Sequence, residues 1–339
     1  MYVRRNIKWN IIFRFAWLNL IIFIALSSIV VYLYHYLDHH GGMNIAIPFQ
    51  PLSVIGIAVA FYIGFKNNSS YDRFWEARKI WGGIVNYSRT WGNQVMSFVN
   101  RDSAKEIYSD EELYHIKEQL IYRHVAWLNA LRFQLRQPSS FSLKHPRTVR
   151  SLMSDDPLCD PWQYEVGGFL DQKEYEYLID RRNTATQLVR EQGKQIAKLK
   201  REGLVNNFEH INMMTSLEEF YNLQGKCERI KNTPFPRQYA FFSKVFTWIF
   251  ILLLPFGMVG EFAKIDHQLI WLTIPFCVLI SWIFITMEIV GDNSEDPFEN
   301  FVNDVPMTAL CRTIEIDLRE MLGETELPEK VKPTNDILM

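Results

Sequence analysis

The feature that most constrains this chain is an uncharged, largely apolar stretch from position 45 to position 65. A helix needs about 20 such residues to cross the hydrocarbon core of a bilayer. The stretch is followed at once by a polar run that begins at Lys66 and includes Asp72 and Arg73. The sequence therefore predicts a membrane-spanning helix that runs directly into water.

Three further apolar stretches extend this pattern to four crossings. They cover residues 11–33, 239–259 and 269–289, and Pro275 is expected to kink the last of them. The first stretch is longer than the core of a signal peptide and follows a basic N-terminal segment. We therefore expect it to be retained, with the N-terminus on the cytoplasmic side. Four crossings return the C-terminus to the same side.

Residues 32–42 are expected to form the outer connection between the first two spans, and the second span to begin near Ile45. Three histidines, His35, His39 and His40, lie in this connection. They would share a face if the segment were helical and could then bind a metal. A solvated loop is the favoured interpretation, because no carboxylate or cysteine completes a closed metal site.

The segment from 72 to 236 is polar and shows helical periodicity without a further stretch long enough to span a membrane. It predicts a helical cytosolic body. Charged or mixed helices are expected at 172–200 and 207–229. The most loop-like region is 138–161, with a short helix possible at 147–153.

These patterns divide the chain into four parts. Residues 1–71 hold the first two transmembrane helices, and residues 72–236 form the cytosolic helical domain. Residues 237–291 hold the third and fourth transmembrane helices, and residues 292–339 form a cytosolic C-terminal segment. The predicted fold class is all-α, with four transmembrane helices continuous with the helical cytosolic domain.

The composition argues against several classes of protein. A formal net charge of -2 is unlike that of a nucleic-acid-binding protein, which usually carries a basic face. The four cysteines are widely spaced, with no CxxC pair, so neither a disulfide framework nor a zinc site is indicated. The sequence contains no Walker loop, no GxGxxG motif opening a helix, no HExxH and no GxSxG. We therefore expect neither an enzyme nor a bound cofactor.

Within the second span, Ile57, Phe61 and Phe65 recur every four residues and have small neighbours such as Gly56 and Gly64. This spacing places the three bulky side chains close to one stripe of a helix. On spacing alone, close helix–helix packing is the favoured interpretation. If several copies surround an axis, the same stripe forms stacked apolar rings that gate a pore by dewetting.

The run IAVAFYIGF, which ends at Phe65, and three later patterns resemble the bestrophin family, and in particular its bacterial branch. The later patterns are Arg73-Phe74-Trp75, then Cys227-Glu228-Arg229-Ile230 with Thr233-Pro234-Phe235-Pro236, and Glu295-Asp296-Pro297-Phe298 with Asn303-Asp304-Val305-Pro306. The resemblance covers most of the chain. It implies a homopentameric ion channel with one central pore. It also carries the family's three neck positions onto Ile57, Phe61 and Phe65.

The resemblance implies a second constriction, the cytosolic aperture, at Ile211. An insertion or deletion in the alignment would move it to Met213 or Met214.

The polar residues that follow the neck could form an anion site. If a helix N-terminus at this point faces the pore, its free N–H groups would attract an anion; otherwise these polar residues serve only as caps. The residues of this possible anion site are Asn67, Asn68, Ser69 and Ser70.

An acidic run after the fourth span resembles the calcium clasp of animal bestrophins, in which carboxylates supply oxygen ligands. The candidate ligands are Asp292, Glu295 and Asp296, but Pro297 and neighbouring residues interrupt the run. A solvated cap at the start of a helix is the favoured interpretation, and a calcium site is the alternative.

The resemblance favours passive conduction of chloride and similar monovalent anions. Phe61 matches the residue at this position in anion-conducting animal members, and phenylalanine ring edges carry partial positive charge. The alternatives are a cation-conducting homologue and a non-conducting, membrane-anchored helical scaffold or signalling protein. The expected partners are further copies of the chain, membrane lipid and small inorganic ions, with no nucleic acid. The expected location is the cell inner membrane or plasma membrane.

Overall fold

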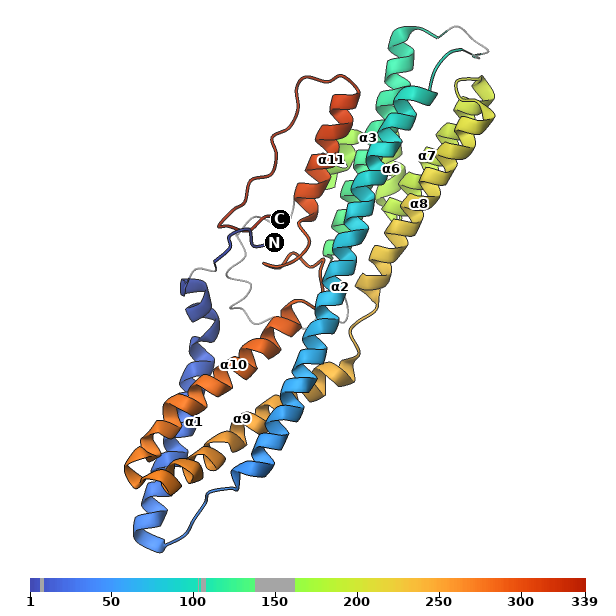
Figure 1. Cartoon of the computed structure of the whole chain (residues 1–339). Coiled ribbons are helices and arrows are strands. Elements are labelled where there is room, and N and C mark those ends of the chain that lie inside the picture. Colours follow the sequence, from blue (N-terminus) through green and yellow to red (C-terminus); the bar gives the residue numbers. More distant parts are fainter. Residues whose placement is uncertain (7–8, 103, 105–107, 138–161) are drawn as a thin grey trace.

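The computed structural model describes residues 1–6, 9–102, 104, 108–137 and 162–339. The molecule is elongated, and one helix, α2 (Phe49–Phe98), runs along most of its length (Figure 1). Its 50 residues rise about 75 Å at the usual 1.5 Å per residue. The remaining helices lie in two groups, one toward each end of α2.

The first group forms the membrane end of the molecule. It consists of the first part of α2 with α1 (Trp9–Gly41), α9 (Arg237–Ile265) and α10 (Thr273–Asn293). A short 3-10 turn, η2 (His267–Leu272), joins the last two helices. Together they supply four helical segments that are long and apolar enough to cross a membrane. The prediction of four spans is confirmed.

The outer end of α1 differs from the sequence prediction. Residues 32–41 continue the helix rather than forming a connection, because no helix-breaking residue occurs before Gly41 and Gly42. Gly42 has φ +60°, a left-handed conformation that ends the helix without strain. The imidazoles of His35 and His39 therefore lie one helical turn apart, with ring centroids separated by 4.4 Å. The solvated-loop interpretation was wrong.

The prolines of the third and fourth spans also differ from expectation. Pro275 lies in the first turn of α10, where the backbone N–H groups have no helical partner and a proline costs little, so the predicted kink was wrong. The proline inside a span is Pro255 of α9. At the inner end, Pro236 immediately precedes α9, where its fixed φ suits the start of a helix.

The second group, which we call the body, consists of the second part of α2 and the helices that pack against it or against one another at that end. These are α3 (Asp110–Arg136), α6 (Gln172–Ile179), α7 (Thr184–Glu202), α8 (Asn207–Asn232) and α11 (Met307–Met321), with the short α5 (Trp162–Glu165) and η1 (Gly167–Phe169) beside α3. The single helix predicted at 172–200 is two helices, because the side chain of Asn183 accepts from the N–H of Thr186 and caps a new start.

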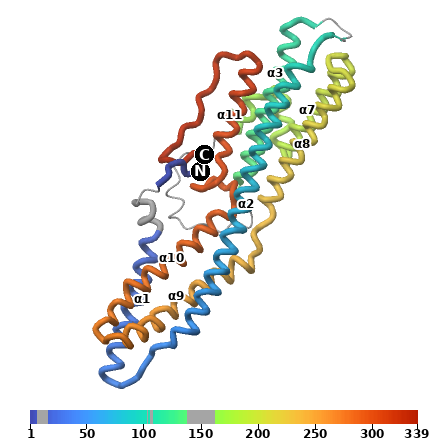
Figure 2. The backbone as a smooth tube through the Cα atoms, viewed as in Figure 1, coloured from blue at the N-terminus to red at the C-terminus, as the bar shows by residue number. Residues whose placement is uncertain are grey.

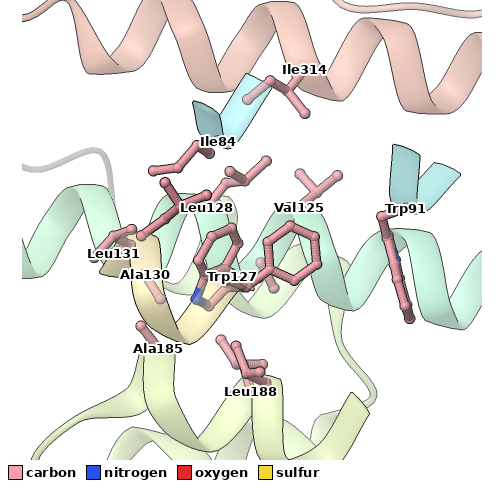
Figure 3. Close-up of a cluster of buried hydrophobic side chains, with 14 of the residues drawn as sticks. Ile84, Trp91, Val125, Trp127, Leu128, Ala130, Leu131, Ala185, Leu188 and Ile314 are labelled. Atoms are coloured by element: carbon pink, nitrogen blue, oxygen red, sulfur yellow. The ribbon is translucent and has the colours of Figure 1, made fainter. Parts of the chain in front are cut away.

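The core of the body forms where α2, α3, α7, α8 and α11 meet (Figure 3). Its largest fully buried side chains include Trp81, Trp91 and Trp127. His124 lies among these rings and shares a hydrogen bond with Ser88, Nε2 to Oγ 2.9 Å. Burial lowers the pKa of His124 to about 3, so it is a neutral part of the core.

Residues 324–339 follow α11 as an extended segment that returns toward the beginning of the chain (Figure 2). The N–H of Val3 donates to the carbonyl of Asp336, and Arg4 forms an ion pair with the Asp336 carboxylate. The last part of the chain is thus an extended segment held against the N-terminal residues. The predicted loop at 138–161, with its helix at 147–153, lies outside the described residues.

Candidate functional site

The apolar stripe of the second span lies on a side of α2 that the other described helices leave largely uncovered. The side chains of Ile57, Phe61 and Phe65 are 70%, 78% and 52% exposed. The opposite side of the same turns is buried against α9 and α10, where Val59 and Ile63 join one apolar cluster. The three predicted neck residues therefore share an exposed face, as their four-residue spacing requires.

The predicted anion site below this stripe depended on a helix N-terminus, and that expectation was wrong. Asn67, Asn68, Ser69 and Ser70 lie in the middle of α2, where the backbone N–H groups belong to the helix itself. Ser70 is buried, and the side-chain amide of Asn68 lies 3.4 Å from the carboxylate of Asp72. The helix continues because this polar run contains no proline or glycine to end it.

Directly after the stripe, Lys66 is buried at the contact of α2 with α9 and α10. It is 1% exposed, and its Nζ lies 2.6 Å from Glu288 Oε1 and 2.5 Å from Asp292 Oδ1. The hydroxyl of Ser243 donates to the other oxygen of Glu288 at 2.6 Å. We call this cluster the Lys66 clamp. A buried charge is costly unless paired, so the clamp fixes these three helices in one arrangement.

Sequence reasoning missed the Lys66 clamp, although a signal was present. Glu288 is the one acidic residue in the apolar run of the fourth span, and Lys66 ends the apolar run of the second. An ionisable residue inside a span usually pairs with another, so these two residues were natural partners. Nothing in their separation along the chain, however, identifies the pair.

Two turns further along α2, Arg73 connects α2 to the end of α8 and to the segment after α10. Its guanidinium donates to three backbone carbonyls, those of Ile230, Thr233 and Glu295, at 3.0, 2.9 and 2.9 Å. Two of these carbonyls belong to the last turn of α8 and the residue that follows it. Arg73 thereby satisfies acceptors that a helix end leaves without partners. The membrane end and the body are joined at this point.

The acidic run after α10 does not begin a helix, so the favoured cap interpretation was wrong. Asp292 lies in the last turn of α10, and the chain stays irregular until α11 begins at Met307. The expected carboxylates instead face separate basic groups. Besides Asp292 in the Lys66 clamp, Glu295 lies 3.3 Å from Arg237, Asp296 lies 3.8 Å from Arg73 and Glu299 lies 3.0 Å from Lys231.

The possible calcium site is affected by this pairing. Each of the three candidate ligands faces a different basic side chain. That side chain compensates the negative charge of the carboxylate, as a calcium ion would. Burial raises the pKa of Glu295 to about 7, and it also raises the pKa of Asp296. Among the described residues, no group of three or more His, Cys, Asp or Glu side chains is placed to hold a metal ion.

The predicted aperture residue, Ile211, lies near the start of α8 and is 60% exposed. Of the two alternatives, Met213 is buried in the core of the body, whereas Met214 is exposed. Ile211 also borders a shallow groove of about 620 Å³ between α7 and α8. Within one copy of the chain, Ile211 and Met214 are the candidates with a free apolar side chain.

One of the predicted neck residues, Phe65, has an aromatic neighbour in the same chain. The ring centroids of Phe65 and Tyr239 are 5.9 Å apart, with 40° between the ring planes. Tyr239 in turn stacks on Tyr62 of α2, with centroids 5.8 Å apart and 25° between the planes. Tyr239 lies in the first turn of α9, so this contact joins the neck stripe to the beginning of the third span.

Comparisons with known proteins agree with one another. The family model described as bacterial/fungal bestrophin protein matches residues 6–320. A relative from Escherichia coli K12, named voltage-dependent anion channel-forming protein YneE, is 29% identical over 308 residues, which are 91% of this chain and 86% of the relative. Another, from Ralstonia nicotianae and named voltage-dependent anion channel-forming protein RSc3414, is 28% identical and covers 97% of each chain.

Solved structures show the same likeness. A crystal structure of a bacterial bestrophin homologue from Klebsiella pneumoniae superposes on 93% of this chain and 100% of its own, with a TM-score of 0.72 and 25% sequence identity. The similarity therefore extends over the membrane end and the body together.

Proposed function

The chain belongs to the bacterial and fungal bestrophin family, and on this premise we propose that it is an anion-conducting membrane channel rather than an enzyme. Curated relatives that it matches over most of its length are named voltage-dependent anion channel-forming proteins. Its four apolar helices fit a membrane location. Passive conduction requires a lined path and no catalytic group, in keeping with the absence of common catalytic motifs from the sequence.

We infer further that five copies surround an axis lined by α2, with the neck at Ile57, Phe61 and Phe65. The observation that carries this proposal is the exposure of three bulky apolar side chains on the face of α2 opposite the stripe that packs against α9 and α10. Around an axis they become stacked rings. An apolar tube a few ångströms wide offers an ion nothing in place of its hydration shell, so the rings close the path by dewetting.

In this proposal a second constriction lies at Ile211 of α8, and the body between the two constrictions encloses a wide vestibule. The boundaries remain those expected from the sequence: spans and neck in 1–71, body in 72–236, spans in 237–291 and a C-terminal segment in 292–339. The protein lies in the inner or plasma membrane with both termini in the cytoplasm, as the basic N-terminal segment favours.

We propose chloride and similar monovalent anions as the conducted ions. Ring edges of Phe61 and Phe65 turned toward the axis present partial positive charge. The acidic run would argue for cations if its charges were free. Its paired carboxylates weaken that argument, since Asp292, Asp296 and Glu299 lie within 4.0 Å of a Lys or Arg side chain.

Planar-bilayer recording of the purified protein in a potassium chloride gradient tests the proposal. We expect single-channel steps that reverse near the chloride equilibrium potential. A reversal near the potassium equilibrium potential would make the channel cation-selective. No steps in any salt would favour the non-conducting scaffold, and a monomer or dimer mass in detergent would reject the pentamer.

A further inference from the structure

The two phenylalanines of the proposed neck differ in what surrounds them. Phe61 projects from α2 without an aromatic partner among the described ring pairs, whereas the ring of Phe65 packs against Tyr239. Tyr239 is itself held between two other rings. It stacks on Tyr62, and the ring of Phe235 meets it at 65° with centroids 6.5 Å apart. Phe235 is buried and anchors the group.

A local backbone contact places Tyr239 next to the linker between α8 and α9. Its N–H donates to the carbonyl of Pro236 at 3.0 Å, in the linker between α8 and α9. The same linker is tied to α2 by Arg73, which donates to the carbonyl of Thr233. The Tyr239 ring is therefore held at a set position relative to α2, two turns of helix from the Arg73 contact.

We propose that Tyr239 is a positioning residue that holds the Phe65 ring at a fixed tilt and thereby sets the anion preference of the neck. The inference rests on the proposed function. An aromatic ring is electrostatically negative on its face and positive at its edge. The tilt of Phe65 decides which of these a permeating ion meets, and a ring without support on one side samples both.

The size of the effect follows from the usual strength of one aromatic contact. Such contacts bias ring orientation by roughly two- to tenfold. Replacing Tyr239 with leucine should therefore lower the chloride-to-sodium permeability ratio roughly two- to tenfold. Tyr239→Phe retains the ring and should leave the ratio within about a factor of two of the parent, because the contact involves the ring and not the hydroxyl.

Phe242→Leu provides a matched control. Phe242 is an exposed aromatic residue one turn along α9 from Tyr239, and its ring stacks on Phe246 with centroids 5.6 Å apart. It has no described ring contact with Phe65. The variant removes a comparable amount of aromatic surface from the same helix and should leave the permeability ratio unchanged. A shift equal to that of Tyr239→Leu would overturn the proposal.

Reversal potentials in a sodium chloride gradient are measured for the parent, Tyr239→Leu, Phe65→Leu and the double variant, after size-exclusion confirms the parental assembly. If Tyr239 acts through Phe65, Tyr239→Leu should have no further effect in the Phe65→Leu background. Additive effects would overturn the proposal. If Tyr239→Leu does not assemble, Tyr62→Leu removes part of the same support and should shift the ratio in the same direction.

The outcomes separate this proposal from the function on which it depends. If Phe65→Leu changes the permeability ratio and neither Tyr239→Leu nor Tyr62→Leu does, the positioning role is rejected and the neck stands. If Phe65→Leu itself changes neither ratio nor conductance, the neck assignment at Phe65 is rejected, and the positioning role with it.

Discussion

The two halves of α2 differ in how completely the chain covers them. In the body, Ile84, Trp91 and Val95 of α2 are fully buried among side chains from other helices. In the membrane half, only 28% of the residues in the apolar window are buried, and Ile57 and Phe61 are exposed. The body closes its own core. The membrane end presents apolar surface of the kind that lipid or other protein chains cover.

For polar side chains the contrast runs the other way, because the membrane end buries charged groups although its apolar surface is largely exposed. The membrane end is loosely covered overall, yet it contains the Lys66 clamp, in which the charged side chains of Lys66 and Glu288 are almost completely removed from solvent. An apolar face can be left to lipid, whereas a charge near the hydrocarbon has to be paired inside the protein. Stability in the membrane half should therefore depend on a few polar contacts, and stability in the body on packing. Four predictions test this difference.

The largest effect is expected for Lys66→Met. It leaves Glu288 and Asp292 close together without their shared cation, and breaking a buried ion pair by removing one partner costs about 3–5 kcal/mol. The thermal midpoint in detergent should fall steeply. In the triple variant Lys66→Met, Glu288→Gln, Asp292→Asn, much of the loss should be recovered. Equal midpoints for parent and Lys66→Met would contradict the clamp.

In the body, Trp127→Ala should cost about 3–4 kcal/mol through the cavity it leaves. Trp127 is 1% exposed, and its indole N–H donates to Gln224 at 3.0 Å. Chemical denaturation of the purified protein measures the loss. Trp75→Ala is the control. Trp75 is exposed, although it lies on α2, the helix that supplies much of the core, so this variant should change stability little. Similar losses for both variants would refute the contrast between packed and uncovered faces.

Asp304 should make stability depend on pH. Burial raises its pKa to about 7, so the folded protein binds a proton that the unfolded chain releases near pH 4. The stability that protonated Asp304 contributes is therefore present at low pH and is lost as pH rises toward 7. Between pH 4.5 and pH 7 the free energy of unfolding should fall by about 3 kcal/mol. Asp304→Asn keeps an acceptor for the Phe301 N–H and should flatten that part of the curve. An unchanged slope in Asp304→Asn would rule the assignment out.

The smallest effect on stability is expected at the neck. Phe61→Ala removes a side chain that is 78% exposed, and such surface changes are usually within about 0.5 kcal/mol. Conductance should nevertheless rise, because a narrower side chain widens the apolar ring. The triple variant Ile57→Ala, Phe61→Ala, Phe65→Ala should give larger or permanently open currents. The same measurement on Ile211→Ala distinguishes the contribution of the aperture from that of the neck. Currents indistinguishable from the parent in the triple variant would count against the neck.

Sequence reasoning worked best where one physical factor dominates. Four apolar blocks separated by charged residues predicted the four spans, because the cost of charge in hydrocarbon leaves little choice. The stripe of Ile57, Phe61 and Phe65 followed from helical spacing alone. The outer part of α1 was harder to predict, since its histidines and tyrosines are compatible with a helix and with a loop.

What the sequence did not show are contacts between distant positions. Lys66 meets Glu288 across 222 residues, and Arg73 recognises backbone carbonyls, whose positions no side-chain pattern reveals. The break at Asn183 depends on one side-chain cap that competes with continued helix, and propensity alone does not decide between them. Of these contacts, those of Arg73 join the membrane end to the body.

The unbroken course of α2 has a mechanical consequence. Between Phe65 and Arg73 the helix contains neither glycine nor proline, so this segment has no natural hinge and acts as a stiff lever. The two residues are eight positions apart, about 12 Å along the axis. A tilt of about 10° with Arg73 as the fulcrum would carry Phe65 sideways by about 2 Å. Small movements of the body would then be transmitted in full to the proposed neck, and the Lys66 clamp would resist them.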